Sequence, residues 1–289
     1  MDEALHLCRE EVLPVFERLG DVRERASTLI KVADILRARG QLDEALRIYR
    51  EEVLPVFERL GDVRERALAL GRVAHILHAR GHLDEAHRIY REEVLPVFER
   101  LGDVRERAST LGKVADILHA QGQLDEALRI YREEELPVYE RLGDVRARAL
   151  TLGRVADILH AQGQLDEALR IRREEELPVY KRLGDVRECA VALVKIADIL
   201  RERGQLDEAL PIYREEVLPL FERLGDSHAV LVTQANLALG LLSRGTPSDR
   251  EEAARLLDQA WAAADRMRLP EAWWIRAIQL AEGLTPGAP

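Results

Sequence analysis

A repeat of 41 residues constrains this chain more than any other feature. Segment 102–142 and the segment that follows it, 143–183, differ at only five positions. A Gly-Asp pair opens each copy, at Gly20-Asp21, Gly61-Asp62, Gly102-Asp103, Gly143-Asp144, Gly184-Asp185 and Gly225-Asp226. Repetition with a period of roughly 20–50 residues is typical of solenoids, in which each unit packs only on its neighbours. The sequence therefore predicts a quasi-linear array without a single central core.

A second glycine in each unit, such as Gly40, divides it into two segments of helical periodicity, helix A and helix B. In helix A, apolar residues recur at the spacing i, i+3, i+4 and i+7, as in Leu29, Val32, Ala33 and Leu36. That spacing gives the helix one apolar face. Gly40 fits a left-handed C-terminal stop, because glycine adopts positive φ at little cost. We expect an all-α fold of antiparallel two-helix repeats.

The start of helix A carries a capping-box pattern. Asp21 precedes the helix and Glu24 follows three residues later, so that each side chain can bond the other's backbone N–H. Ala147 interrupts the pattern in the fourth unit.

Helix B, at about 42–60 in the first full unit, contains an interior proline. The equivalent prolines are Pro14, Pro55, Pro96, Pro137, Pro178 and Pro219. An interior proline removes one backbone hydrogen bond and clashes with the preceding turn. We expect a kink at about 51–55 in every repeat.

The repeat also sets the expected boundaries. Residues 1–19 align with helix B alone, and regular repeats follow at 20–60, 61–101, 102–142, 143–183 and 184–224. We expect a degenerate sixth repeat at 225–269, a capping helix at 270–283 that carries Trp273 and Trp274, and a tail at 284–289. The half-repeat leaves an apolar face open, which a longer parent chain or a second copy would cover.

The residues of one unit resemble the tetratricopeptide repeat. The motif is Leu29-x-x-Val32-Ala33-x-x-Leu36, followed by Gly40, Leu42-Asp43-Glu44-Ala45 and Tyr49. The long period resembles the branch of this family that includes kinesin light chain. The resemblance implies a right-handed superhelix whose helices A line a concave groove and whose helices B form the convex side. It further implies that the groove holds an extended peptide or a partner helix.

The groove positions that follow from this resemblance form our candidate site. They are Lys31, Asp34, Arg37, Arg72, His75, His78, Lys113, Asp116, His119, Arg154, Asp157, His160, Lys195, Asp198, Arg201 and Asn236. In the long-repeat branch, asparagines on helix A grip the peptide backbone, and here Asn236 alone keeps that amide. The lysine of the family's carboxylate clamp is also missing, with Gly71 and Gly112 among the residues in its place. Binding of chaperone tails is therefore not expected.

The basic members of this row allow two interpretations. Regularly spaced Arg and Lys side chains can bind an acidic or repetitive protein partner. They can instead pair within their own helix, because an aspartate such as Asp116 follows three residues after Lys113.

The glycines at Gly71, Gly112 and Gly153 also allow two interpretations. They either open room for a ligand or permit the close approach of a neighbouring helix, and simple inheritance from one duplicated unit also accounts for them. Tyrosines such as Tyr49 on helix B are expected to pack in the core without a direct function.

Histidines recur at His78, His119 and His160, with His75 one turn before His78. Repeat neighbours lie roughly 8–10 Å apart, too far for one ion to bridge, so no metal or other cofactor is expected. Groove-surface histidines that respond to pH are the simpler interpretation.

Composition limits the functional classes. The formal net charge of −10 disfavours a nucleic-acid partner, and no apolar run is long enough to span a membrane. Cys8 and Cys189 are far apart, which predicts free thiols in a reducing, cytoplasmic compartment. No phosphate-binding loop or nucleophile motif is present, so no enzymatic activity is expected.

These observations favour a non-catalytic scaffold that binds a protein or peptide along the groove. Two alternatives stay open. The chain could be the sensor or regulatory arm of a larger signalling NTPase or protease. It could also be a structural solenoid that forms a homodimer or stacks end to end through residues 1–19.

Overall fold

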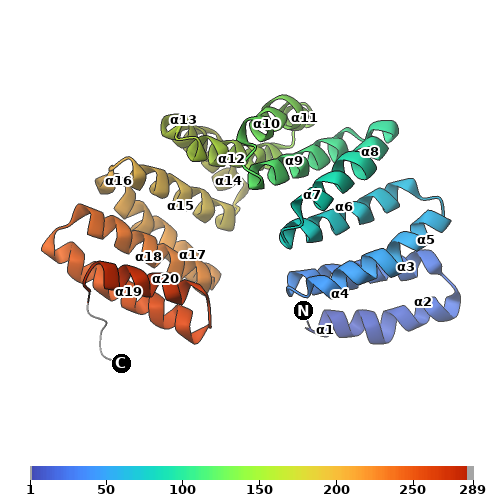
Figure 1. Ribbon diagram of the computed structural model, residues 1–289, viewed down its shortest axis with the longest axis horizontal. Coiled ribbons are helices and arrows are strands. Elements are labelled where there is room, and N and C mark those ends of the chain that lie inside the picture. Colours follow the sequence, from blue (N-terminus) through green and yellow to red (C-terminus); the bar gives the residue numbers. More distant parts are fainter. Residues whose placement is uncertain (1, 285–289) are drawn as a thin grey trace. The chain divides into compact units, whose positions relative to one another are not determined.

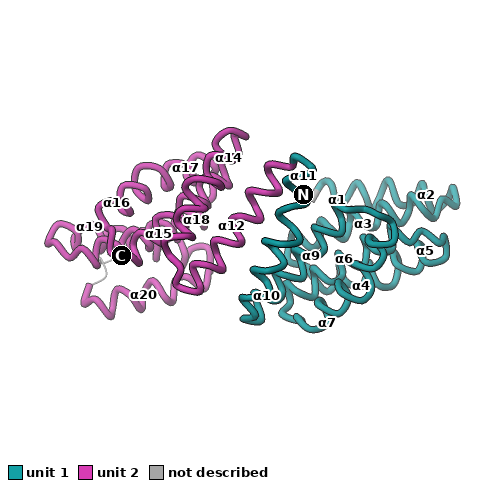
Figure 2. Tube along the Cα trace, turned by 90° about the horizontal axis from the view of Figure 1, so that it is seen from above, with its two compact units in different colours: residues 1–143 teal, residues 144–289 magenta. Residues whose placement is uncertain are grey.

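A computed structural model describes residues 2–284, which are helical apart from short turns (Figure 1). Of the predicted tail, only Leu284 lies within the described residues. The chain divides into two compact units, residues 1–143 and 144–289 (Figure 2). No helix among the described residues is long and apolar enough to cross a membrane.

Helices of type A begin after each Gly-Asp pair. In unit 1 they are α3 (Val22–Ala38), α6 (Val63–Ala79) and α9 (Val104–Ala120), which lie side by side in Figure 1. In unit 2 they are α12 (Val145–Ala161), α15 (Val186–Glu202) and α18 (Ser227–Arg244). The predicted apolar stripe is their buried face: Val32 and Leu36 are each 1% exposed, and Ala33 is fully buried. The expected all-α array of two-helix repeats is confirmed within each unit.

Type B segments are each interrupted by a π-helical stretch. In unit 1 they are α1 (Asp2–His6), η1 (Leu7–Val12), α2 (Leu13–Leu19), α4 (Leu42–Arg47), η2 (Ile48–Val53), α5 (Leu54–Arg59), α7 (Leu83–Arg88), η3 (Ile89–Val94), α8 (Leu95–Leu101), α10 (Leu124–Arg129), η4 (Ile130–Glu135) and α11 (Leu136–Leu142). In unit 2 they are α13 (Leu165–Arg170), η5 (Ile171–Glu176), α14 (Leu177–Leu183), α16 (Leu206–Pro211), η6 (Ile212–Val217) and α17 (Leu218–Leu224). The uninterrupted helices α19 (Pro247–Arg266) and α20 (Glu271–Ala281) follow.

The interior proline accounts for the π-helical stretch. In η2, the wider turn makes Leu54 N–H donate to the Tyr49 carbonyl five residues earlier, directly before Pro55. A wider turn moves the ring of Pro55 away from the carbonyl that an α-helix would press against it. Helix α19 shows the contrast. Its proline, Pro247, lies in the first turn, and the helix is α-helical throughout. Sequence reasoning located the irregularity at 51–55 but expected a simple kink and missed the change of helix type.

The capping prediction needs a correction. Asp21 does accept a hydrogen bond from Glu24 N–H at 3.0 Å, and Asp144 accepts one from Ala147 N–H at 2.9 Å. Alanine at position 147 therefore does not prevent capping by Asp144, because the donor is the backbone N–H of Ala147. The reciprocal bond of a capping box is absent from α3, since the Asp21 N–H already donates to the Phe16 carbonyl at 3.0 Å. Gly20, at φ 68°, makes that turn possible.

Candidate protein-binding site

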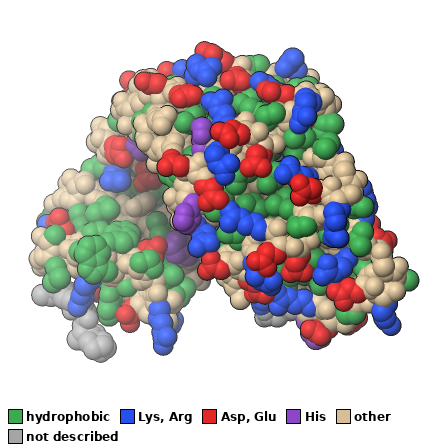
Figure 3. Space-filling view, turned by 45° about the vertical axis from the view of Figure 1, so that its right-hand side comes forward, with side chains coloured by type: hydrophobic (Ala, Val, Ile, Leu, Met, Phe, Trp, Pro, Cys, Tyr) green, Lys and Arg blue, Asp and Glu red, His purple; other side chains and the backbone are tan. Residues whose placement is uncertain are grey.

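The structure places the predicted groove residues on helices A. In unit 1 they are Lys31, Asp34 and Arg37 on α3, Arg72, His75 and His78 on α6, and Lys113, Asp116 and His119 on α9. In unit 2 they are Arg154, Asp157 and His160 on α12, Lys195, Asp198 and Arg201 on α15, and Asn236 on α18. Acidic and basic side chains are interspersed over the face shown in Figure 3.

Each groove aspartate accepts a hydrogen bond from helix B of its own repeat. Tyr49 Oη donates to Asp34 at 3.0 Å, and Tyr131 Oη donates to Asp116 at 2.6 Å. Tyr213 and Asp198 form the same bond. Burial raises the pKa of Tyr49 and Tyr213, so the phenols remain donors at neutral pH. The tyrosines are buried as expected, but they also fix the aspartates, a role that sequence reasoning missed.

A second contact joins these aspartates to the following repeat. Arg72 Nη1 lies 2.8 Å from Asp34, and Lys195 Nζ lies 3.3 Å from Asp157. Pairing within one helix, the predicted alternative, is present between Lys113 and Asp116 at 3.3 Å. Exposed pairs of this kind contribute about 0–1 kcal/mol each. Their regularity means that most groove charges already have partners inside the protein.

Repeat 2 breaks this pattern, because His75 stands where the other regular repeats have aspartate. Tyr90 Oη, left without that carboxylate, donates instead to the Gly71 carbonyl at 2.8 Å. Burial lowers the pKa of His75, and Lys113 and Arg37 nearby lower it further. His75 is therefore neutral at pH 7. The two nearby cations also have aspartate partners, since Lys113 pairs with Asp116 at 3.3 Å and Arg37 with Asp34 at 3.8 Å.

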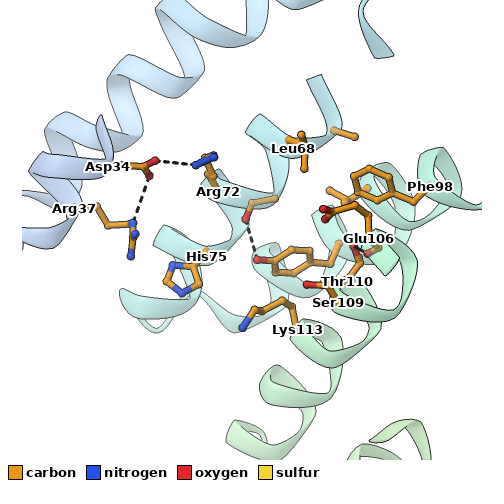
Figure 4. A pocket seen from close by; sticks show the side chains of 14 residues that line it. Asp34, Arg37, Leu68, Arg72, His75, Phe98, Glu106, Ser109, Thr110 and Lys113 are labelled. Carbon is orange, nitrogen blue, oxygen red and sulfur yellow. Dashed lines mark hydrogen bonds and ion pairs between the residues drawn. The ribbon is translucent and has the colours of Figure 1, made fainter. Parts of the chain in front are cut away.

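A pocket of about 310 Å³ lies at the same place (Figure 4). Arg37, Arg72, His75 and Lys113 line one side of it, and Leu68 and Phe98 lie toward the other. We call it the repeat-2 pocket. Two acidic residues also line the pocket. Asp34 pairs with Arg72, and Glu106 lies on the side of Phe98.

Two small residues facing each other explain the repeat-2 pocket. In repeat 1 the corresponding pair on helices A and B is Ile30 with Val53, and in repeat 3 it is Gly112 with Glu135. An added Cβ at Gly112 would lie 2.4 Å from Glu135 Oε1, so the glutamate fills the space of the missing side chain. Repeat 2 combines Gly71 with Val94, which leaves the space open.

The glycine interpretations are thereby separated. Gly112 and Gly153 leave room for glutamate side chains of helix B in the same repeat, a use that neither a ligand nor the close approach of a helix describes. At Gly71 the nearest atom to an added Cβ would be Tyr90 Cε1 at 3.7 Å, and the glycine lines the pocket. The sequence signal was the paired change of size across the two helices, which a comparison of single positions does not detect.

Repeat 4 contains a buried ion cluster that sequence reasoning also missed. Arg172 replaces the tyrosine and is 2% exposed. Its guanidinium donates to Asp157 at 2.7 Å, to Glu176 at 2.7 Å and to the Gly153 carbonyl at 3.2 Å. Burial raises the pKa of the Glu176 carboxyl, and the attraction of Arg172 opposes that rise.

The histidines form no ligand cluster. Among the described residues, no group of three His, Cys, Asp or Glu side chains converges in a way that could hold a metal ion. His160 Nε2 lies instead 2.7 Å from Glu202.

The family model of the tetratricopeptide repeat matches residues 24–94 and 106–175. Both segments are tetratricopeptide repeats. Solved tetratricopeptide structures share the fold of this chain, including a putative kinesin light chain from P. anserina with nearly identical repeats. That protein is 21% identical with a TM-score of 0.56, over 70% of this chain and 96% of the other.

Two further solved structures are similar in fold. One is a signal-transduction ATPase from Pyrococcus horikoshii with a tetratricopeptide sensor, at 18% identity and a TM-score of 0.72, over 96% of this chain and 43% of the other. The other is a Rap protein in complex with competence and sporulation factor, at 14% identity and a TM-score of 0.67, over 89% and 74%. No curated protein sequence matches the chain.

Proposed function

We propose that this protein is a non-catalytic scaffold that binds a protein partner through helices A, with the repeat-2 pocket as its anchoring point. The pocket would take a large apolar side chain of the partner, with a neighbouring Asp or Glu beside His75. The observation that carries this proposal is the replacement of the groove aspartate by His75 at the place where the pocket opens.

The chemistry of the occupant follows from the other repeats. Where aspartate is present, as at Asp34, its carboxylate accepts from a tyrosine of its own repeat and from a base of the next. At repeat 2, Lys113 is the base of the next repeat, and Arg37 lies on the other side of His75. A carboxylate supplied by the partner would restore the missing negative charge. The apolar floor at Leu68, Val94 and Phe98 would bury the adjacent side chain.

A selection experiment tests the proposal. Phage-displayed random peptides selected on this protein should be enriched in an acidic residue close to Leu, Ile, Phe or Trp. His75→Asp restores the acid of the repeat, and Gly71→Ile fills the pocket as Ile30 does in repeat 1. Each variant should weaken binding of the selected peptides by about tenfold or more, equivalent to about 1.4 kcal/mol.

His82→Asp is the matched control, because it makes the same change of charge in the same repeat but outside the pocket. It should bind like the wild type. Peptides without an acidic residue, or equal affinity for His75→Asp and wild type, would contradict the proposal.

A sensor arm of a larger signalling protein is a second candidate. It is favoured by the similarity to the P. horikoshii ATPase, whose match covers 96% of this chain. Identification of the full-length product of the gene tests it, and a product without an NTPase or other effector domain would exclude this role.

A further inference from the structure

The fifth repeat lacks an arginine that fills a fixed place in other repeats. Near the start of helix A, Arg25 lies between two glutamates, with Nε 3.1 Å from Glu17 and Nη2 3.3 Å from Glu52. Arg107 repeats this arrangement, at 3.3 Å from Glu99 and 3.2 Å from Glu134. In each case one glutamate belongs to the preceding helix B and the other to the helix B of the same repeat.

In repeat 5 both members of the first contact are changed. Cys189 occupies the arginine position, and Lys181 occupies the place of the preceding glutamate. The second glutamate is retained as Glu216. A pocket of about 380 Å³, which we call the repeat-5 pocket, remains where the guanidinium would lie. Its apolar wall includes Leu193 and Leu220, and the side chains at its rim include Lys181 and Glu216.

Four charged side chains line this pocket: Lys181, Glu215, Glu216 and Arg223. Arg223 Nε donates to the Pro219 carbonyl at 3.3 Å. In other repeats an arginine covers the equivalent glutamate. The side chains of these glutamates are 28%, 28% and 27% exposed in Glu52, Glu134 and Glu175. Glu216, without an arginine, is exposed. Across residues 2–284, neither Lys181 nor Glu216 has an ion-pair partner.

The thiol is not the recognition group. Cys189 is 9% exposed, and burial raises the pKa of its thiol, so that it stays protonated and uncharged at neutral pH. Its contribution is its small size, which keeps the pocket open.

We propose that the repeat-5 pocket binds an arginine side chain of a protein partner, with an acidic residue of the same partner segment next to it. The guanidinium would take the place that Arg25 and Arg107 take in their repeats and pair with Glu216. Its methylene stem would lie against Leu193 and Leu220. The acidic neighbour would pair with Lys181. This contact is separate from the repeat-2 pocket and belongs to unit 2.

The test uses two acetylated and amidated pentapeptides, Arg-Ala-Ala-Ala-Glu and its analogue with citrulline in place of Arg. Citrulline keeps the shape of arginine and removes its charge. Titration followed by backbone amide NMR shifts should show saturable changes confined to residues near Cys189 and Glu216. The arginine peptide should bind at least about fivefold more tightly than the citrulline peptide, as expected for a charge-assisted bond.

Two variants separate the pocket from the charge. Cys189→Ser preserves the open space and should bind like the wild type. The double variant Cys189→Arg with Lys181→Glu recreates the arrangement of Arg107 with Glu99 and should fold stably but lose the shifts. Equal binding of both peptides, shifts that persist in the double variant, or no shifts in the wild type would overturn the proposal. His75 does not line the repeat-5 pocket, so this test is independent of the repeat-2 proposal and can succeed even if that proposal fails.

Discussion

At the residue scale, the same residue type has different consequences in equivalent positions. Gly71 and Gly112 both lie at the middle of a helix A, where glycine costs about 1 kcal/mol relative to alanine. The surroundings differ, since Gly71 faces Tyr90 across ordinary contact distance and Gly112 faces the carboxylate of Glu135. What each glycine does is therefore decided by the opposing helix B.

We predict opposite effects of alanine at these two glycines. Gly71→Ala should stabilise the protein by up to about 1 kcal/mol, because its Cβ fits and the helix gains propensity. Gly112→Ala should destabilise it by about 1–3 kcal/mol, since the Glu135 carboxylate must move in a packed interior. Urea unfolding followed by circular dichroism measures both. Adding Glu135→Val to Gly112→Ala should recover most of the loss, and no recovery would show that Glu135 is not the obstacle.

Arg172 is the other residue whose role depends on its neighbours. Its guanidinium is the shared partner of Asp157 and Glu176, and Glu176 is 5% exposed. Removal of Arg172 would leave the buried Glu176 carboxylate without its cation, although Asp157 would keep Lys195 at 3.3 Å. Breaking a buried ion pair in this way typically costs about 3–5 kcal/mol.

We therefore predict that Arg172→Ala destabilises the protein by about 3 kcal/mol or more. The control is Arg173→Ala, because that neighbouring side chain makes an exposed pair with Glu208 at 3.1 Å. Its loss should cost at most about 1 kcal/mol. Thermal and urea unfolding of the two variants check the difference, and equal losses would contradict the importance of the buried cluster.

At the element scale, helix A depends on one half of the predicted capping box. Asp62 accepts from Glu65 N–H at 3.1 Å, while its own N–H donates to the Phe57 carbonyl at 3.0 Å. The bond from Glu65 N–H, with a smaller contribution from Arg23, holds the pKa of the Asp62 carboxyl below its usual value. Its stabilising effect is therefore present above that usual value and is lost as the pH falls through the lower pKa.

Asp62→Ala should destabilise the protein by about 0.5–2 kcal/mol at pH 7. Glu65→Ala should have less effect, because the backbone of residue 65, not its side chain, makes the capping bond. The loss caused by Asp62→Ala should shrink at acidic pH, where the carboxylate of the wild type is protonated. Unfolding at neutral and acidic pH checks both statements, and an equal cost of Glu65→Ala would indicate a complete capping box.

At the scale of the whole molecule, the common residues of the repeats form the helical array, and the residues that differ between repeats line the two pockets. The repeat-2 pocket depends on His75 and on Gly71 opposite Val94, and the repeat-5 pocket depends on Cys189 with Lys181. Each pocket lies within one unit and shares no residue with the other. Energetic effects at sites without shared partners usually add.

Gly112 and Arg172 share no contact partner, because Gly112 faces Glu135 and Arg172 binds Asp157 and Glu176. The stability effects of Gly112→Ala and Arg172→Ala should therefore be additive within about 0.5 kcal/mol. Their contacts lie in units 1 and 2 respectively. Unfolding of the double variant measures the sum. A deviation well above that limit would show that the two mutated positions are energetically coupled and would contradict this prediction.

The period, the helix pairs, the glycine turns and the family could all be predicted from the sequence, because each rests on local spacing that recurs in every copy. The sequence also indicated the groove positions through the family resemblance, and those remain proposals as binding residues. The folded structure was needed to show which charges are already paired, since Arg72 and Asp34 are 38 positions apart. It alone showed the pockets, because an open space depends on the sizes of side chains that meet across two helices. Gly71, Gly112 and Gly153 look alike in the sequence, and only the residue that faces each one distinguishes a filled interior from an open pocket.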